Sequence, residues 1–110
     1  MKYERDRQFY RTKIRSGDVA VFRVGAFRMP IREISEGGIR YEPSSDHAPE
    51  IGERVNGTVV LETIGDIGVS GTFTRIQDGS FVLMLDPPGI PDATITAFQR
   101  FLMQRYSGGG

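Results

Sequence analysis

Apolar and polar residues alternate with a period of two along most of the chain between residues 18 and 85. Alternation of this kind is typical of strands that bury one face. The segments that carry it, or that are dense in β-branched and aromatic residues, are 18–24, 27–35, 38–41, 54–62, 67–76 and 80–85. Six short strands at this spacing predict a mainly β domain, built as an antiparallel barrel or sandwich.

Turn residues separate these segments. Asp78 and Gly79 form a sequence that suits a tight hairpin, because both residues tolerate the positive φ that such turns need. The polar stretch 42–52 is interpreted as an exposed loop. Pro30 cannot donate a ladder hydrogen bond, so we expect it at a sheet edge or beside a bulge.

The period changes after the last predicted strand. From residue 91 the apolar residues Ile95, Phe98 and Leu102 recur at helical spacing, and Asp92 is placed as a cap or first-turn acid. We therefore predict a helix over 91–106 that buries its apolar stripe against the sheet and closes one end of it. A flexible tail is expected over 107–110.

Length and composition limit the possibilities. At 110 residues the chain is expected to form one domain over 1–106, and it contains no cysteine, which excludes disulfides and thiolate metal sites. It has no apolar run near the roughly 20 residues needed to cross a bilayer. The first residues lack the apolar core of a signal peptide. These features predict a cytoplasmic protein without membrane insertion.

The net charge is zero, but the charges are unevenly distributed. Residues 1–15 hold six basic residues against two acidic ones. The segment 1–17 is therefore predicted to be a basic N-terminal arm, followed by a β-barrel over 18–86. A basic arm on a neutral body indicates a local anionic partner rather than a surface for bulk nucleic acid or membrane.

Two short motifs carry the candidate chemistry. The first is Arg7-Gln8-Phe9-Tyr10-Arg11, with two arginines four residues apart in the basic arm. A guanidinium group forks onto phosphate oxygens or onto the O6/N7 edge of guanine, and its flat face stacks on a purine.

The second motif is Glu33-Ile34-Ser35-Glu36-Gly37-Gly38, at a predicted strand turn. Here Glu33 offers an acceptor for the N1–H and N2–H donors of guanine, Ser35 offers a hydroxyl, and Gly38 allows a close approach of the backbone. A plain strand turn with a solvent-facing acid is the alternative for this segment alone.

In this order, ahead of a run of short strands, the two motifs resemble the signature of the PilZ domain, RxxxR followed by [D/N]xSxxG. The resemblance extends from about residue 5 to residue 106 and implies a six-stranded antiparallel split barrel with a C-terminal helix packed on it. It also implies binding of the bacterial second messenger cyclic di-GMP, with Arg7 and Arg11 on its phosphates and guanines. Ser35 and Gly38 would line the base site, and Glu33 stands where the family has Asp or Asn.

The resemblance leaves two functions open. The first is a sensor that binds cyclic di-GMP and relays its level to a protein effector. The second is a PilZ-fold adaptor that has lost nucleotide binding and acts through protein contacts alone. An OB- or SH3-like binder of DNA or RNA ranks last, because such a protein would spread basic and aromatic residues along its strands.

No enzyme, metal site or cofactor is predicted. The single histidine, His47, follows Ser44, Ser45 and Asp46 in the predicted exposed loop. Adjacent residues in a loop do not make a catalytic triad, which needs residues that converge in space. A single histidine without cysteines is also a poor basis for a zinc site.

Overall fold

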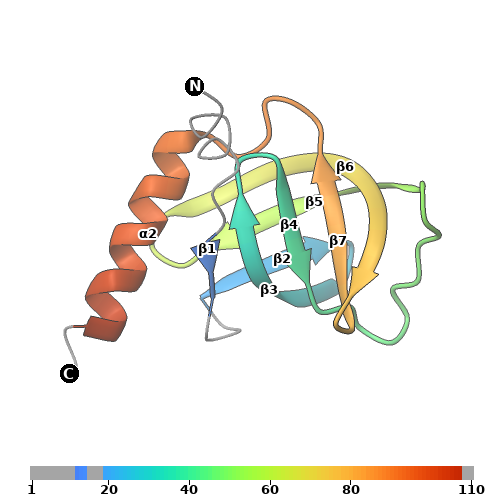
Figure 1. Cartoon of the computed structure of the whole chain (residues 1–110), viewed down its shortest axis with the longest axis horizontal. Helices are drawn as coiled ribbons and strands as arrows, with labels where there is room; N and C mark the ends of the chain where they lie inside the picture. The colour runs from blue at the N-terminus through green and yellow to red at the C-terminus, as the bar shows by residue number, and fades with distance from the viewer. Residues whose placement is uncertain (1–11, 15–18, 108–110) are drawn as a thin grey trace.

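The computed structural model describes residues 12–14 and 19–107, which form one sheet and one helix (Figure 1). The elements are β1 (Thr12–Lys13), β2 (Ala20–Val24), β3 (Phe27–Ser35), β4 (Gly38–Tyr41), β5 (Arg54–Leu61), β6 (Gly65–Gln77), β7 (Ser80–Leu85) and α2 (Asp92–Ser107). The six predicted strands and the predicted helix are all present, with ends that differ by at most two residues. The short strand β1 lies within the segment that the sequence assigned to the arm.

The strands pair antiparallel in the order β3-β2-β5-β6-β7-β4, and β4 pairs with β3 again. This last pairing closes the sheet into a six-stranded barrel. The alternative of an open sandwich is thereby excluded, and the expected antiparallel barrel with a C-terminal helix is confirmed. β1 is added to the ring by its pairing with β3.

β3 joins the two sides of the barrel because it pairs with different neighbours along its length. Its first half pairs with β2, and its second half pairs with β1 and β4. A β-bulge interrupts the β3–β4 register between Ile31 and Glu33. Pro30 directly precedes this bulge, in agreement with one of the two positions expected for it.

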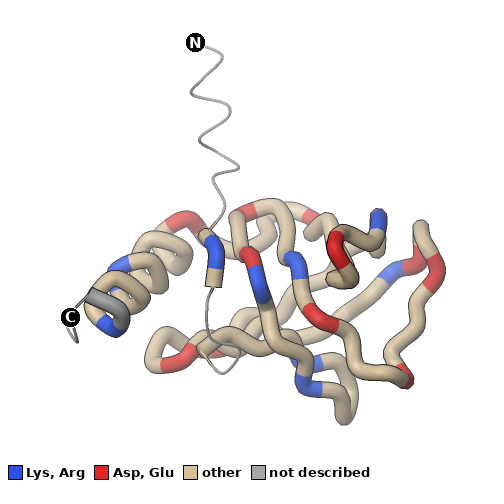
Figure 2. The backbone as a smooth tube through the Cα atoms, turned by 60° about the horizontal axis from the view of Figure 1, so that its bottom comes forward, with Lys and Arg blue, Asp and Glu red and all other residues tan. Residues whose placement is uncertain are grey.

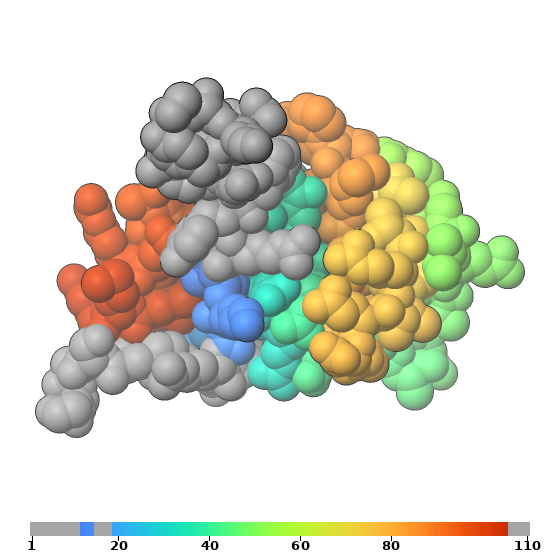
Figure 3. Space-filling view, in the orientation of Figure 1, coloured from blue at the N-terminus to red at the C-terminus, as the bar shows by residue number. Residues whose placement is uncertain are grey.

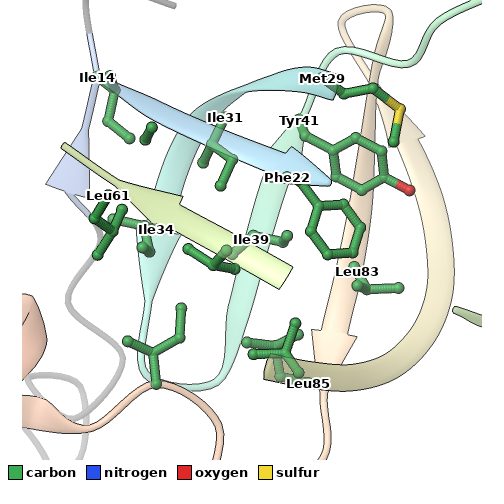
Figure 4. Packing of buried hydrophobic residues seen from close by; sticks show 14 of the residues in the cluster. Ile14, Phe22, Met29, Ile31, Ile34, Ile39, Tyr41, Leu61, Leu83 and Leu85 are labelled. Atoms are coloured by element: carbon green, nitrogen blue, oxygen red, sulfur yellow. The ribbon is translucent and has the colours of Figure 1, made fainter. Parts of the chain in front are cut away.

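The bulge changes which side chains face the core. Before it, Met29 and Ile31 are fully buried, so uninterrupted alternation would also turn Glu33 and Ser35 inward. One extra residue reverses the phase, and Ile34 and Ile39 become the core residues at this end of the barrel. Figure 4 shows Ile31, Ile34 and Ile39 in the same packed interior.

The core is a continuous apolar cluster inside the barrel. Phe22 and Tyr41 are fully buried, with their ring centroids 4.9 Å apart, and Leu83 packs beside them (Figure 4). Close approach of strands requires glycine at Gly71, where a Cβ atom would overlap the backbone carbonyl of Met84.

The loop between β4 and β5 is mostly exposed, as predicted, but the interpretation was wrong for His47, which anchors it. His47 is only 8% exposed, and its Nε2 atom lies 2.7 Å from the Tyr41 hydroxyl. Its ring also packs against Phe27 and Phe81. The loop therefore covers one end of the barrel, with its histidine turned inward.

The helix α2 lies along another side of the barrel (Figure 1). It buries Ile95, Phe98 and Leu102 in the core cluster, as its spacing predicted. The Gln99 amide donates to the Thr12 hydroxyl of β1 at 2.9 Å. In the part of the chain that the structure describes, no helix has the length and apolarity needed to span a membrane.

Candidate functional site

The second motif lies where β3 turns into β4. In the antiparallel register Glu33 is paired with Arg40, and Ser35 is paired with Gly38. The three motif residues Glu33, Ser35 and Gly38 are therefore brought together on two adjacent strands. Arg7 and Arg11 lie outside the residues that the structure describes, so their role stays a prediction.

Glu33 and Arg40 form an ion pair across the two strands. The Arg40 Nε group donates to Glu33 Oε1 at 3.3 Å, and the two side chains are 19% and 10% exposed for Arg40 and Glu33 respectively. Arg40 Nη1 also donates to the hydroxyl of Ser80 at 3.1 Å. Ser80 is itself buried, so the guanidinium group is held from two sides.

Ser35 closes the turn. Its hydroxyl donates to the carbonyl oxygen of Gly38 at 3.2 Å. A Cβ atom at Gly38 would lie 3.2 Å from the Leu83 carbonyl oxygen, which is tight against the neighbouring strand. A glycine at this position lets β4 lie close to β7 and leaves the adjoining surface open.

These residues line a hollow of about 270 Å³ on the outer surface of the barrel. Its walls come from the β3–β4 turn and from β6 and β7, with Thr74, Arg75 and Gln77 on the far side. Figure 3 shows this face of the barrel, where β3 and β4 (cyan to green) lie between β1 (blue) and β6–β7 (yellow to orange).

A second bulge borders the hollow. The β6–β7 register shifts between Phe73 and Arg75, and the Thr74 hydroxyl donates to the Val82 carbonyl oxygen at 3.1 Å. Because Val69 and Phe73 are buried, uninterrupted alternation would send Arg75 into the core. The bulge instead leaves Arg75 exposed at the rim of the hollow.

Sequence reasoning missed several residues of this hollow. Arg40 and Arg75 add positive charge to it, and Met84, which is 58% exposed, adds an apolar surface. Arg40 becomes a candidate only when the β3–β4 register is known. Arg75 carries a weak signal, because a charged residue at an inward position of an alternating strand indicates a bulge.

Elsewhere the surface charge is mixed. Figure 2 shows Lys and Arg interspersed with Asp and Glu over the described strands and helix. Within those residues, no group of three or more His, Asp or Glu side chains is arranged to hold a metal ion. A second hollow, beside His47, is lined by Asp46, Glu53 and Arg54 together with apolar residues.

The environment of His47 shifts two pKa values. Burial raises the pKa of the Tyr41 phenol well above its usual range. Burial lowers the pKa of His47, while the charge of Glu53 acts in the opposite direction. The pair is therefore neutral near pH 7, with the phenol as donor to the imidazole or the reverse, according to the tautomer.

Searches of protein-family models and of curated proteins gave no match. Solved structures with the same fold exist. The chain resembles the crystal structure of the uncharacterised Legionella protein Lpg0364, with a TM-score of 0.60 and 16% identity, over 93% of this chain and 100% of that one.

It also resembles MrkH from K. pneumonia, solved in complex with c-di-GMP, with a TM-score of 0.63 and 12% identity. This match covers 93% of the present chain and 53% of MrkH. At such identities the similarity shows the fold, which is the barrel that the resemblance to PilZ domains implied.

Proposed function

We propose that this protein binds cyclic di-GMP on the outer face of β3, β4 and β6. The observation that carries the proposal is the convergence of Glu33, Ser35 and Gly38 in one hollow, beside Arg40. The likeness in fold to MrkH, which was solved with c-di-GMP, supports it.

The chemistry of the hollow suits a guanine base. The Glu33 carboxylate is an acceptor for N1–H and N2–H, which adenine does not present together. Gly38 leaves room for a planar base near the backbone, and Met84 offers an apolar surface beside it. At about 270 Å³ the hollow is smaller than pockets that enclose a whole ligand, so it would hold one base.

The phosphates would be bound by arginine. In the proposal Arg7 and Arg11 close over the nucleotide from the N-terminal segment, in agreement with the family pattern. Arg75 lies at the rim of the same hollow and adds a positive charge there. A ligand that joins the basic segment to the barrel would create a new surface for a protein effector, which is how a binding event would be relayed.

Calorimetric titration with cyclic di-GMP tests the proposal. Arg7→Ala and Arg11→Ala are each expected to weaken binding by about 1.5–3 kcal/mol, the size of a charge-assisted hydrogen bond. Ser35→Ala is expected to cost roughly 1 kcal/mol, since it removes one neutral hydroxyl bond.

A control is available in Arg28→Ala. Arg28 is an exposed arginine on the first half of β3 and does not line the hollow. This variant is expected to bind as the wild type does. If the folded wild-type protein gives no heat with millimolar cyclic di-GMP, the proposal is refuted.

The ion pair between Glu33 and Arg40 favours a second candidate function. In this structure the Glu33 carboxylate already accepts a hydrogen bond from a neighbouring side chain. If the Glu33 carboxylate only stabilises the fold through this bond, the protein would suit the role of an adaptor that keeps the barrel and acts through protein contacts alone. Absence of binding by a folded wild type in the same titration would support this function.

A further inference from the structure

Arg40 is one of the residues of the hollow that no motif identified, and its contacts indicate a role. It lies on β4, where its side chain is 19% exposed, and it donates hydrogen bonds to a carboxylate and to a hydroxyl group. One bond reaches Glu33, the predicted base acceptor. The other reaches Ser80, which does not line the hollow.

These contacts form a chain of three residues, Ser80–Arg40–Glu33, across β7, β4 and β3. The register explains the arrangement, because Glu33 and Arg40 face each other directly on adjacent strands. The planar guanidinium group makes both bonds with one rigid fork, which a lysine cannot do. The position of the Glu33 carboxylate is therefore tied to a buried serine outside the hollow.

Resting on the proposed function, we propose that Arg40 is a positioning residue that sets the guanine selectivity of the site. Glutamate has one methylene more than the aspartate of the family motif, and it has more side-chain conformers. The bond from Arg40 fixes the longer side chain in one of them. A carboxylate accepts several hydrogen bonds, so its bond to Arg40 is compatible with bonds to a base.

Selectivity is the property that separates this role from a simple charge effect. The positive charge of Arg40 would favour any cyclic dinucleotide, because all of them carry two phosphates. A correctly placed Glu33 carboxylate favours guanine alone, since the N1 atom of adenine is an acceptor and is repelled by it. The ratio of affinities for cyclic di-GMP and cyclic di-AMP therefore reports the position of Glu33.

The experiment measures this ratio by calorimetry for the wild type and for variants. Arg40→Ala is expected to lower the preference for cyclic di-GMP by about tenfold, the effect of one charge-assisted hydrogen bond. Ser80→Ala removes the second anchor of Arg40 without touching the hollow. It is expected to lower the ratio in the same direction, by about two- to fivefold.

A matched control lies in the same hollow. Arg75 is also an arginine of the lining, but its Nη2 group donates to Gln77, not to Glu33. Arg75→Ala is expected to lower the affinity for both nucleotides equally and to leave the ratio of the two affinities within about twofold of the wild-type value. Arg40→Lys, which keeps the charge, is expected to give a ratio between those of wild type and Arg40→Ala, and it serves if Arg40→Ala does not fold.

The dependence on Glu33 is tested in a Glu33→Gln background. There Arg40→Ala is expected to change the ratio by less than about twofold, because the charged acceptor is already absent. An equal loss of affinity for both nucleotides in Arg40→Ala would overturn the proposed role of Arg40. A change of the ratio by Arg40→Ala in the Glu33→Gln background as large as in the wild type would overturn it too. Neither result would contradict the proposed binding of cyclic di-GMP. A wild type that binds neither nucleotide refutes the proposed function, and the role of Arg40 with it.

Discussion

Tyr41→Phe removes one buried hydroxyl group and leaves the aromatic ring in place. In the folded protein this hydroxyl lies 2.7 Å from His47 Nε2, with Tyr41 fully buried and His47 8% exposed. The hydrogen bond is one of the polar contacts that hold the β4–β5 loop over the end of the barrel, together with backbone bonds such as that from the Gly52 N–H to the Phe73 carbonyl oxygen. Its loss leaves a ring nitrogen of His47 without a partner in a site with little access to water.

The size of the effect follows from that burial. A hydrogen bond contributes about 1 kcal/mol net, and an unpaired buried polar group costs about 1–3 kcal/mol, so we expect a loss of about 1–3 kcal/mol in the free energy of unfolding. For a domain of this length about 1 kcal/mol lowers the Tm by about 4 °C, which gives a decrease of about 4–12 °C.

The assay is thermal unfolding of four proteins: the wild type, Tyr41→Phe, His47→Leu and the double variant. When both partners are replaced by apolar groups, no polar group is left unpaired. The double variant is therefore expected to lose less unfolding free energy than the two single variants lose together. A coupling energy below about 0.3 kcal/mol, or a Tyr41→Phe protein that melts within about 1 °C of the wild type, would show that the bond does not hold the loop.

Three further predictions follow from other contacts. Glu33→Asp retracts the carboxylate by on the order of 1 Å, which breaks the 3.3 Å contact with Arg40. We therefore expect several-fold weaker binding of cyclic di-GMP by calorimetry. Tighter binding would show that the family residue is better even in this site. Burial lowers the pKa of His47 from its ordinary 6.5, so the unfolded chain takes up the proton first as the pH falls. Stability to urea should therefore be full above about pH 6.5 and should decrease as the pH falls through the pKa of the folded state. The His47→Gln variant should lack this dependence. Gly71→Ala should lower the Tm, since its Cβ would overlap a carbonyl group of β7. Gly68→Ala is the control, because a Cβ atom there meets no atom within 4 Å. Its free energy of unfolding, measured by chemical unfolding, should stay within about 0.5 kcal/mol of the wild-type value.

The strands were predictable because their signal is local. Alternation and turn residues are properties of short segments, so the six ring strands and α2 could be placed within two residues. β1 could not be placed, because the two residues Thr12 and Lys13 are too few to show a period. Ring closure could be inferred only through the resemblance, since alternation fits a barrel and a sandwich equally.

The site was predictable in part. The motif gave Glu33, Ser35 and Gly38, and the structure brings these three residues together. Arg40 required the cross-strand register, which no local pattern fixes. His47 was misjudged because its polar neighbours are typical of an exposed loop, whereas its burial depends on rings contributed by distant strands.

The two bulges leave a mark in the sequence that needs no family motif. In β3 the apolar residues step by two from 27 to 29 to 31 and then by three to Ile34. In β6 the buried positions step by two from Val69 through Gly71 to Phe73, and the next apolar residue, Ile76, follows three positions later. Both steps of three occur where a strand borders the hollow. In other chains of this fold, a change of step at corresponding points of the third and sixth strands would locate the face that carries this hollow even where the motif residues have diverged.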